Sequence, residues 1–203
     1  MRHIETIPIC ANTLFIYKLD IKNDLTLKFK KEKFSLSKSN DSETDKFMSL
    51  VSEDFNVLSK YKELNKEIKK AVDQTLKKIL MFENIDYRIF SSWITKTPPH
   101  SFSDQHNHCN SWLSGVYYSK GNPGFGIKFS HNGISQFFTP PKKYNIYNSH
   151  EWTVIPKDNY LILFFSHLRH QIMPNLSSED RYSLAFNIIP KGNFGLGDST
   201  IKF

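Results

Sequence analysis

The sequence has little cysteine, little arginine and no long apolar run. Its two cysteines, Cys10 and Cys109, are too few for a disulfide-stabilised scaffold or a multi-cysteine zinc module. The longest apolar run, Tyr160–Phe165, is far shorter than the roughly 20 residues that span a bilayer. The first ten residues contain no long apolar segment of the kind found in a secretory signal. These absences predict a soluble, cytoplasmic protein.

Positive charge is in modest excess, with 27 Lys and Arg against 20 Asp and Glu and a net charge of +7. Most of these cations are Lys, which attracts anions as a hydrated point charge before it reads bases. No RNA-binding motif or Arg-rich stripe accompanies the charge. The excess therefore predicts a mildly basic surface. The length of 203 residues and the apolar fraction of 39% exclude a wholly disordered chain and predict one packed domain.

The first 84 residues are predicted to hold short strands and two supporting helices. Thr6–Ile9 and Leu14–Lys18 resemble strands, and the Ser-rich segment 34–45 is typical of a surface loop. One helix is predicted from residue 45 to about Phe55. A clearer helix follows, because apolar residues recur there at helical spacing, namely Leu64, Ile68, Ala71, Val72, Thr75, Leu76, Ile79 and Leu80.

Residues 85–203 change to short aromatic and β-branched runs separated by turn signals, a pattern typical of a sandwich or barrel. We therefore expect a mainly β fold, with the N-terminal helices packed against it. The predicted strands are Tyr87–Trp93, Trp112–Tyr118, Phe125–Ser130, Glu151–Ile155, Tyr160–Phe165 and Tyr182–Ile189.

Two of the eight histidines stand two residues apart, in the segment Gln105-His106-Asn107-His108. In extended backbone, residues i and i+2 project from the same face, so both imidazoles can point toward one place. Neutral imidazole is the commonest side-chain ligand of transition metals. The pattern fits a metal site, and it also fits a loop with two exposed histidines.

A second candidate region begins with the apolar strand that precedes His167 and His170. Eleven residues after His170, Arg181 opens a strand that is otherwise apolar on one face. A buried guanidinium beside hydroxyl groups makes a bidentate clamp for a carboxylate. Ser183, two residues on, and a Tyr from a neighbouring strand would supply the hydroxyls. An ordinary surface arginine at a strand end fits the same pattern.

Taken together, these motifs resemble the 2-oxoglutarate- and Fe(II)-dependent dioxygenases, and more narrowly a prolyl-hydroxylase-like group of marine bacteria and phages. The resemblance covers about Tyr87 to the C-terminus, including KGNFGL at Lys191–Leu196. It implies a double-stranded β-helix, a cupin-like jelly-roll barrel, in a bacterial or phage-infected host cell. It is carried by His106-Asn107-His108, Leu113–Tyr118, Phe164–His170, Met173-Pro174-Asn175 and Arg181–Asn187.

The resemblance also implies the cofactors Fe(II), 2-oxoglutarate and O₂, the hydroxylation of an unactivated C–H bond, and the release of succinate and CO₂. No catalytic residue beyond the metal ligands is implied. The implied roles are metal binding by His106, His108 and His170, 2-oxoglutarate binding by Arg181, Ser183 and Tyr118, and pocket lining by Asn187, Tyr117 and Trp112.

One departure separates the chain from the general family. The family has H-x-D or H-x-E, which gives two histidines and one carboxylate on the metal. Here the third position is His108, so the site has one negative charge fewer.

Two other functions fit the same motifs. The first is a three-His cupin dioxygenase that needs no 2-oxoglutarate, in which Arg181 would hold a substrate carboxylate. The second is a non-catalytic jelly-roll protein with a binding or structural role.

The substrate is predicted to be a small molecule or a peptide, with no membrane partner. The loop after Gly121 and the segment Phe137–His150 are candidate substrate-facing lids, because functional variation gathers in loops on a fixed scaffold. The second segment also reads as a long surface connection. The sequence leaves the oligomeric state open, a homodimer included.

Overall fold

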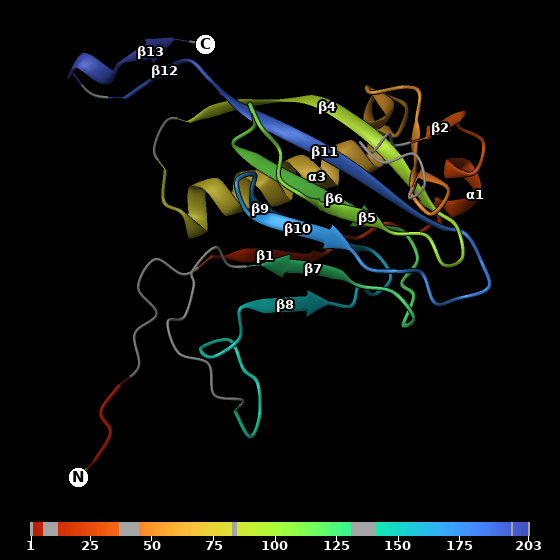
Figure 1. The fold of residues 1–203 in the computed structure, drawn as a ribbon. Helices are drawn as coiled ribbons and strands as arrows, with labels where there is room; N and C mark the ends of the chain where they lie inside the picture. Colours follow the sequence, from red (N-terminus) through yellow and green to blue (C-terminus); the bar gives the residue numbers. More distant parts are fainter. Residues whose placement is uncertain are drawn as a thin grey trace.

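A computed structural model describes most of the chain, and its helices and strands are drawn in Figure 1. The described residues are 2–5, 12–36, 45–82, 85–130, 141–195 and 197–202. The strand predicted at Thr6–Ile9 lies outside them. Among the described residues, no helix combines the length and the apolar character needed to cross a membrane.

Seven strands form the larger sheet, in the order β1-β9-β6-β11-β4-β3-β2, and each neighbouring pair is antiparallel. The two longest strands, β4 and β11, pair along most of their length. The strands are β1 (Leu14–Lys18), β2 (Phe34–Leu36), β3 (Leu50–Ser52), β4 (Asp86–Thr97), β6 (Leu113–Tyr118), β9 (Tyr160–Phe165) and β11 (Arg181–Lys191).

Four strands form the smaller sheet, in the order β5-β10-β7-β8, and it faces the larger one to complete the jelly-roll (Figure 1). A short C-terminal hairpin of β12 and β13 extends from the end of β11. These strands are β5 (Ser103–His106), β7 (Ile127–Ser130), β8 (Glu151–Val154), β10 (Arg169–Ile172), β12 (Asn193–Phe194) and β13 (Ile201–Lys202).

The main helix, α3 (Lys62–Gln74), covers the outer face of the larger sheet and continues as a π-helical turn, η2 (Thr75–Ile79). Its apolar side chains, including Leu64, Ile68 and Val72, recur three to four residues apart and are buried against the sheet. The shorter helical segments are α1 (Thr26–Phe29), η1 (Val57–Lys60) and η3 (Gly197–Ser199).

Alternation along β6 divides the protein into two cores. Leu113 and Tyr117 point outward, into the cluster shared with α3. Val116 and Tyr118 point inward, into a second cluster between the two sheets. Successive side chains of a strand face opposite sides, so one strand supplies both the structural core and the inner cavity.

The mainly β jelly-roll and the helix over residues 64–80 are confirmed, as are the strands at Leu14–Lys18 and Tyr160–Phe165. The helix predicted from residue 45 to Phe55 is wrong. Its centre forms β3, because Leu50 and Val51 pair with β2 on one side and with β4 on the other. The segment predicted as a loop from residue 34 begins with β2.

Candidate metal and dicarboxylate site

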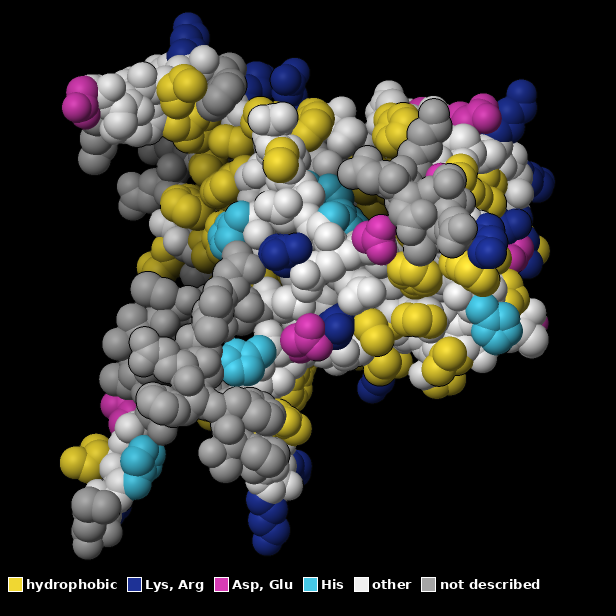
Figure 2. All heavy atoms as spheres, viewed as in Figure 1, with side chains coloured by type: hydrophobic (Ala, Val, Ile, Leu, Met, Phe, Trp, Pro, Cys, Tyr) yellow, Lys and Arg dark blue, Asp and Glu magenta, His cyan; other side chains and the backbone are white. Residues whose placement is uncertain are grey.

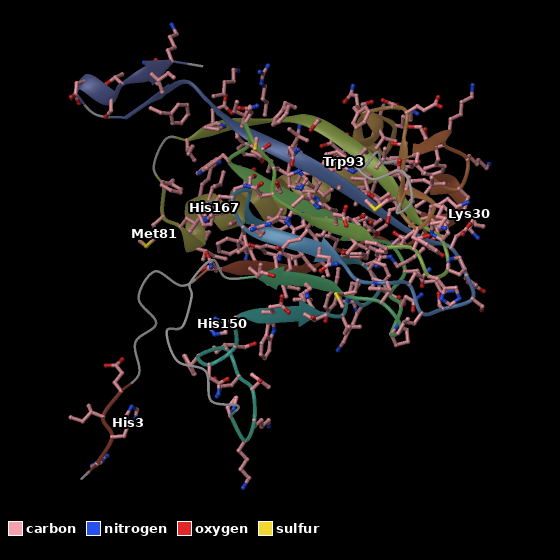
Figure 3. All side chains as sticks on the ribbon, viewed as in Figure 1. His3, Lys30, Met81, Trp93, His150 and His167 are labelled. Atoms are coloured by element: carbon pink, nitrogen blue, oxygen red, sulfur yellow. The ribbon has the colours of Figure 1, made fainter. Side chains whose placement is uncertain are left out.

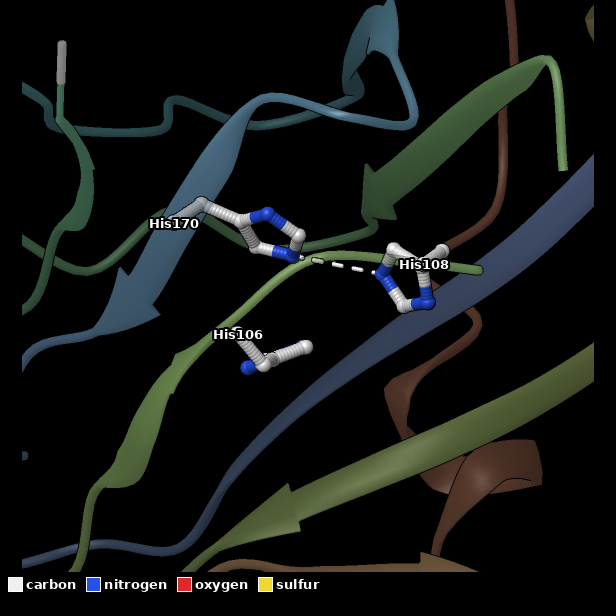
Figure 4. A group of neighbouring side chains, drawn as sticks. All are labelled: His106, His108 and His170. Atoms are coloured by element: carbon white, nitrogen blue, oxygen red, sulfur yellow. Dashed lines mark hydrogen bonds between the residues drawn. The ribbon is translucent and has the colours of Figure 1, made fainter. Parts of the chain in front are cut away.

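Three histidines from the smaller sheet and the loop that follows β5 come together (Figure 4). His106 ends β5 and lies directly opposite His170 of β10 in the antiparallel register. His108 follows in the loop, where its backbone N–H donates to the carbonyl oxygen of Ser166 at 3.0 Å. Strand pairing therefore aligns two of the imidazoles, and a backbone hydrogen bond positions the third.

The spacing of the three rings suits a single ion. One nitrogen from each ring lies within 4.8 Å of the other two. The Nε2 atoms of His108 and His170 are 3.3 Å apart. Two adjacent ligands with metal–nitrogen bonds of about 2.1 Å lie about 3 Å apart when they subtend a right angle at the ion. A small adjustment of the rings would thus complete a three-nitrogen face.

Backbone carbonyls fix the orientation of two of the rings. The Nδ1 of His106 lies 2.7 Å from the carbonyl oxygen of Asp104, and the Nδ1 of His170 lies 3.0 Å from that of Leu168. Each carbonyl accepts a hydrogen bond from an Nδ1–H, so this assignment leaves an unprotonated Nε2 on both rings, and that of His170 accepts from the Nε2 of His108 in the absence of a metal. A histidine that ligates a metal is commonly braced in this way through its other nitrogen.

Burial keeps the inner rings neutral. It lowers the pKa of His170 to about 3, with the nearby His106 and His108 rings lowering it further. Burial and the His106 ring lower the pKa of His108 to about 4. Phe164 packs edge-on against His170, and Trp93 packs against His108. At neutral pH both imidazoles are therefore uncharged, which is the form that binds a metal.

Arg181 carries a positive charge in the protein's interior. It is 4% exposed, opens β11 opposite Thr97, and places its guanidinium over the ring of Phe125. None of its three side-chain nitrogens has a hydrogen-bond partner. Burial lowers its pKa to about 9, so the guanidinium is still charged at neutral pH.

Two hydroxyl groups near Arg181 are also unsatisfied. Tyr118 is fully buried, with the guanidinium carbon 4.9 Å from its ring centre, and Ser183 follows Arg181 on the same face of β11. Neither the Tyr118 nor the Ser183 hydroxyl has a partner. Buried polar groups are nearly always satisfied, and an unpaired buried charge is costly. Five donor atoms without acceptors therefore fit a bound carboxylate.

A cavity of about 520 Å³ joins the histidines to the two hydroxyl groups. His106 and His170 line it together with Tyr118 and Ser183. This volume lies within the usual range for small-molecule sites. The residues present therefore fit both a metal ion and a dicarboxylate that reaches from the ion toward Arg181.

The N-terminal strands contribute a wall that the sequence analysis missed. Phe55 and Trp93 lie against each other, with ring centres 6.3 Å apart, and both line the cavity. Asp104, from β5, lines it as well. The signal for Trp93 was its place in an alternating strand, whereas nothing local distinguished Phe55. The apolar part of this wall consists of Leu36, Met48 and Val51.

Three predicted pocket residues do not line the cavity. Tyr117 points outward along β6, and its hydroxyl donates to Asn159 at 2.7 Å. Trp112 packs against Phe82 outside the sheets. Asn187 does face inward, but it lies behind the histidines, where its Oδ1 accepts a hydrogen bond from Ser114 at 2.8 Å. The alternation of β6 accounts for Tyr117.

Asn187 belongs to a buried network behind His108. The hydroxyl of Ser114 also lies 2.8 Å from that of Ser166. Ser166 in turn accepts the backbone N–H of His108 through its carbonyl oxygen. These bonds connect β6, β9 and β11 to the loop that carries the third imidazole.

The candidate lids take no part in the described cavity wall. Gly121 donates its N–H to Asp158, and residues 141–150 are mostly exposed, while part of the second lid lies outside the described residues. His3 lies in the N-terminal extension, and His150 lies beside β8 (Figure 3). Lys and Arg side chains are scattered over the visible face (Figure 2), in keeping with a mildly basic surface.

Comparison with known proteins finds a match to one family model. Residues 91–187 match the family model described as "Putative 2OG-Fe(II) oxygenase". The matched stretch contains the three histidines together with Arg181 and Ser183. No curated protein matches the chain by sequence.

Solved structures share the fold at low identity. A Pseudomonas putida prolyl-4-hydroxylase is 16% identical, with a TM-score of 0.56 over 87% of this chain and 92% of that one. A Trichoplax adhaerens prolyl hydroxylase, solved with a hypoxia inducible factor peptide, is 12% identical, with a TM-score of 0.60 over 88% and 84%.

A third structure is that of the epimerase SnoN from nogalamycin biosynthesis, in complex with Fe³⁺, alpha ketoglutarate and nogalamycin RO. It is 8% identical, with a TM-score of 0.62 over 88% of this chain and 79% of that one. At such identities these similarities show the jelly-roll fold alone, and the resemblance to the oxygenase family rests on the match over residues 91–187. Residues 91–187, just under half of the chain, therefore resemble the 2-oxoglutarate- and Fe(II)-dependent oxygenases, a family whose cofactors are Fe(II), 2-oxoglutarate and O₂.

Proposed function

We propose that this protein hydroxylates an unactivated C–H bond of a small molecule or peptide, with the release of succinate and CO₂. His106, His108 and His170 would hold the Fe(II). Arg181, Ser183 and Tyr118 would hold the distal carboxylate of 2-oxoglutarate. The proposal treats residues 1–203 as one oxygenase domain, because α3 of the N-terminal part packs on the same sheet that supplies Arg181.

The observation that carries the proposal is the unsatisfied cluster at Arg181. Its guanidinium and the hydroxyls of Tyr118 and Ser183 are buried without partners, and both hydroxyl-bearing residues line the same cavity as His106 and His170. A bound carboxylate would accept hydrogen bonds from all three groups and neutralise the charge. A jelly-roll with only a structural role would have no use for this costly arrangement.

Bound iron, together with 2-oxoglutarate and O₂, supplies the oxidant that attacks the C–H bond. The chain's own residues would hold and orient the cofactors and shield them from water. The two braced imidazoles keep their lone pairs directed toward the site, and Arg181 fixes one end of the dicarboxylate. Phe164 and Val116 give the cavity a dry wall, which limits the access of water to a reactive intermediate.

The third histidine makes the proposed metal site less negative than the usual pair of histidines and one carboxylate. His108 is neutral, so no carboxylate of the chain would directly balance the charge of Fe(II). Three neutral imidazoles still form a sound ligand set. A dioxygenase that needs no 2-oxoglutarate is the second candidate, since Arg181 could then hold a carboxylate of the substrate.

The test loads anaerobic protein with Fe(II) and 2-oxoglutarate and records the visible charge-transfer band of the complex. We expect the band in the wild type and its loss in His170→Ala. His167→Ala is the matched control, because His167 is exposed and lies three residues earlier, in the turn before β10. It should keep the band.

Two results separate the candidates. Iron binding without a band, and substrate oxidation without succinate, would favour the dioxygenase that needs no 2-oxoglutarate. A protein that binds neither Fe(II) nor a substitute metal would contradict both.

A further inference from the structure

The proposed function uses only part of the cavity. His106, His170, Tyr118 and Ser183 line one portion of it, and the wall built by Phe55, Trp93 and Asp104 has no role in the proposed function. The isolated bridge between Met48 and Phe102 ties this wall to the start of β5. The wall therefore stands next to the metal ligands, where a substrate must lie.

Asp104 brings a carboxylate into this wall. It precedes His106 by two residues in β5, where the pairing with β10 shifts register, and both residues line the cavity. It is the one Asp or Glu that lines the described cavity. The ion pairs of the described residues join other carboxylates to lysines and do not include Asp104.

Two aromatic rings flank the same space. Phe55 is 56% exposed although it lines the cavity, and it packs against Trp93. Trp93 also contacts the ring of His108, with centres 5.7 Å apart. An exposed aromatic face beside a carboxylate attracts cations, because the ring face is electron-rich. Leu36 and Val51 add apolar surface between these groups and the bulk solvent.

We infer that the substrate carries a cationic ammonium or guanidinium group on an apolar stem, and that Asp104 determines this specificity. The inference rests on the proposed function, because it places the reacting carbon of the substrate near the three histidines. The separation of Asp104 and His106 along β5 then sets the length of the stem. Two residues span at most about 7 Å of backbone, which corresponds to several methylene groups.

Charge also sorts the two ligands of the cavity. The dianion 2-oxoglutarate finds its counter-charge at Arg181 and is repelled by Asp104. A cationic substrate is attracted by Asp104 and repelled by Arg181. Each ligand is therefore disfavoured at the other's position, which is how a site shared by two ligands avoids binding either one twice.

The experiment adds matched probes to the anaerobic complex with Fe(II) and 2-oxoglutarate and follows the perturbation of its visible band. L-lysine is paired with L-norleucine, and L-arginine with L-citrulline, so that each pair differs chiefly in the charge of the distal group. We expect at least one of the two cationic probes to bind about tenfold more tightly than its neutral partner, as measured by the probe concentration that perturbs the band.

Asp104→Asn should reduce that preference to about twofold or less. Asp20→Asn is the control, since Asp20 is an exposed carboxylate outside the cavity. Equal binding within each pair, an unaltered preference in Asp104→Asn, or no perturbation by either cation would overturn the inference while the band still supported the proposed function. Absence of the band in the wild type would remove the proposed function and the inference together.

Discussion

Two regions of the cavity are built in opposite ways. The cluster of Arg181, Tyr118 and Ser183 comes from the central strands β6 and β11 and is almost completely buried. In the wall of Phe55, Trp93 and Asp104, Phe55 comes from a segment after β3 and Asp104 from the edge strand β5, and both are exposed, whereas Trp93 lies in β4. The first region suits a ligand of fixed shape, whereas the second can change without disturbing the core.

The contrast has a physical cause. Central strands are hydrogen-bonded on both sides, so a side chain there is held by the register of its neighbours. Arg181 and Ser183 are paired with Thr97 and Thr95 of β4, and the β6 side of β11 is paired from Leu184 onward. The wall depends on short strands and connections, which tolerate substitution because they lie at the surface. A shared cofactor is thus expected to bind in the first region and a particular substrate in the second.

The largest expected effect follows from replacing Arg181 by methionine. The iron-loaded variant should bind 2-oxoglutarate about 30-fold to several thousand-fold more weakly, because truncating one partner of a buried charge pair costs about 2–5 kcal/mol. The unliganded variant should also melt at a higher temperature than the wild type, since it no longer buries an unpaired charge. Anaerobic calorimetric titration and thermal melts measure the two effects.

Arg169→Met is the control for that change. Arg169 is exposed in β10, so its replacement should alter neither the affinity for 2-oxoglutarate nor the response of the melting temperature to it. An unchanged affinity in Arg181→Met would contradict the clamp and with it the contrast between the two regions.

The same contrast separates what the sequence predicted from what it missed. The alternation that begins at Arg181 and the apolar run Tyr160–Phe165 are local patterns, and each corresponds to a central strand. Strands β2 and β3 have three residues each, too few for a period to show. Strand β2 is placed by pairing with β3, and β3 by pairing with β4, which lies far along the chain from both.

Candidate site residues follow the same rule. His106, His108 and His170 were marked by residue type and spacing, which carry chemical meaning without a structure. Phe55 entered the cavity wall only through tertiary contacts with Trp93. Tyr117 was misplaced because aromatic residues stand side by side at positions 117 and 118, and composition does not show which one faces inward.

A second change tests the support behind the metal site. Ser114→Ala removes hydrogen bonds to Ser166 and Asn187, so the free energy of unfolding should fall by about 1–3 kcal/mol. Because Ser166 holds the backbone of His108, the affinity for Fe(II) should fall about tenfold. Denaturant unfolding and anaerobic metal titration measure these effects.

Ser111→Ala is the matched control for this serine. Its hydroxyl is buried without a hydrogen-bond partner, so its removal should leave stability unchanged or slightly higher. Equal effects of the two substitutions would show that the network does not position His108.

A smaller effect than that of Arg181→Met is expected from Tyr118→Phe, which removes one hydroxyl from the buried cluster and keeps the ring. One hydrogen bond to a charged carboxylate contributes about 1.5–3 kcal/mol, so the affinity for 2-oxoglutarate should fall about 12- to 160-fold. Tyr117→Phe is the paired control on the opposite face of β6, and it should leave that affinity unchanged. A larger loss in Tyr117→Phe than in Tyr118→Phe would reverse the assignment of the two faces.

The smallest effect on the cofactors is expected from Phe55→Ala, in the exposed wall. The side chain is more than half exposed, so stability should change by no more than about 0.5 kcal/mol, and the band with Fe(II) and 2-oxoglutarate should stay the same. What should change is the binding of the substrate, because half of the aromatic pair with Trp93 is lost. Titrating the most effective cationic probe into the anaerobic complex measures this. The division of the cavity into two parts would be contradicted if Phe55→Ala bound 2-oxoglutarate more weakly than the wild type but bound the cationic probe with unchanged affinity. Phe55 would then belong to the cofactor region.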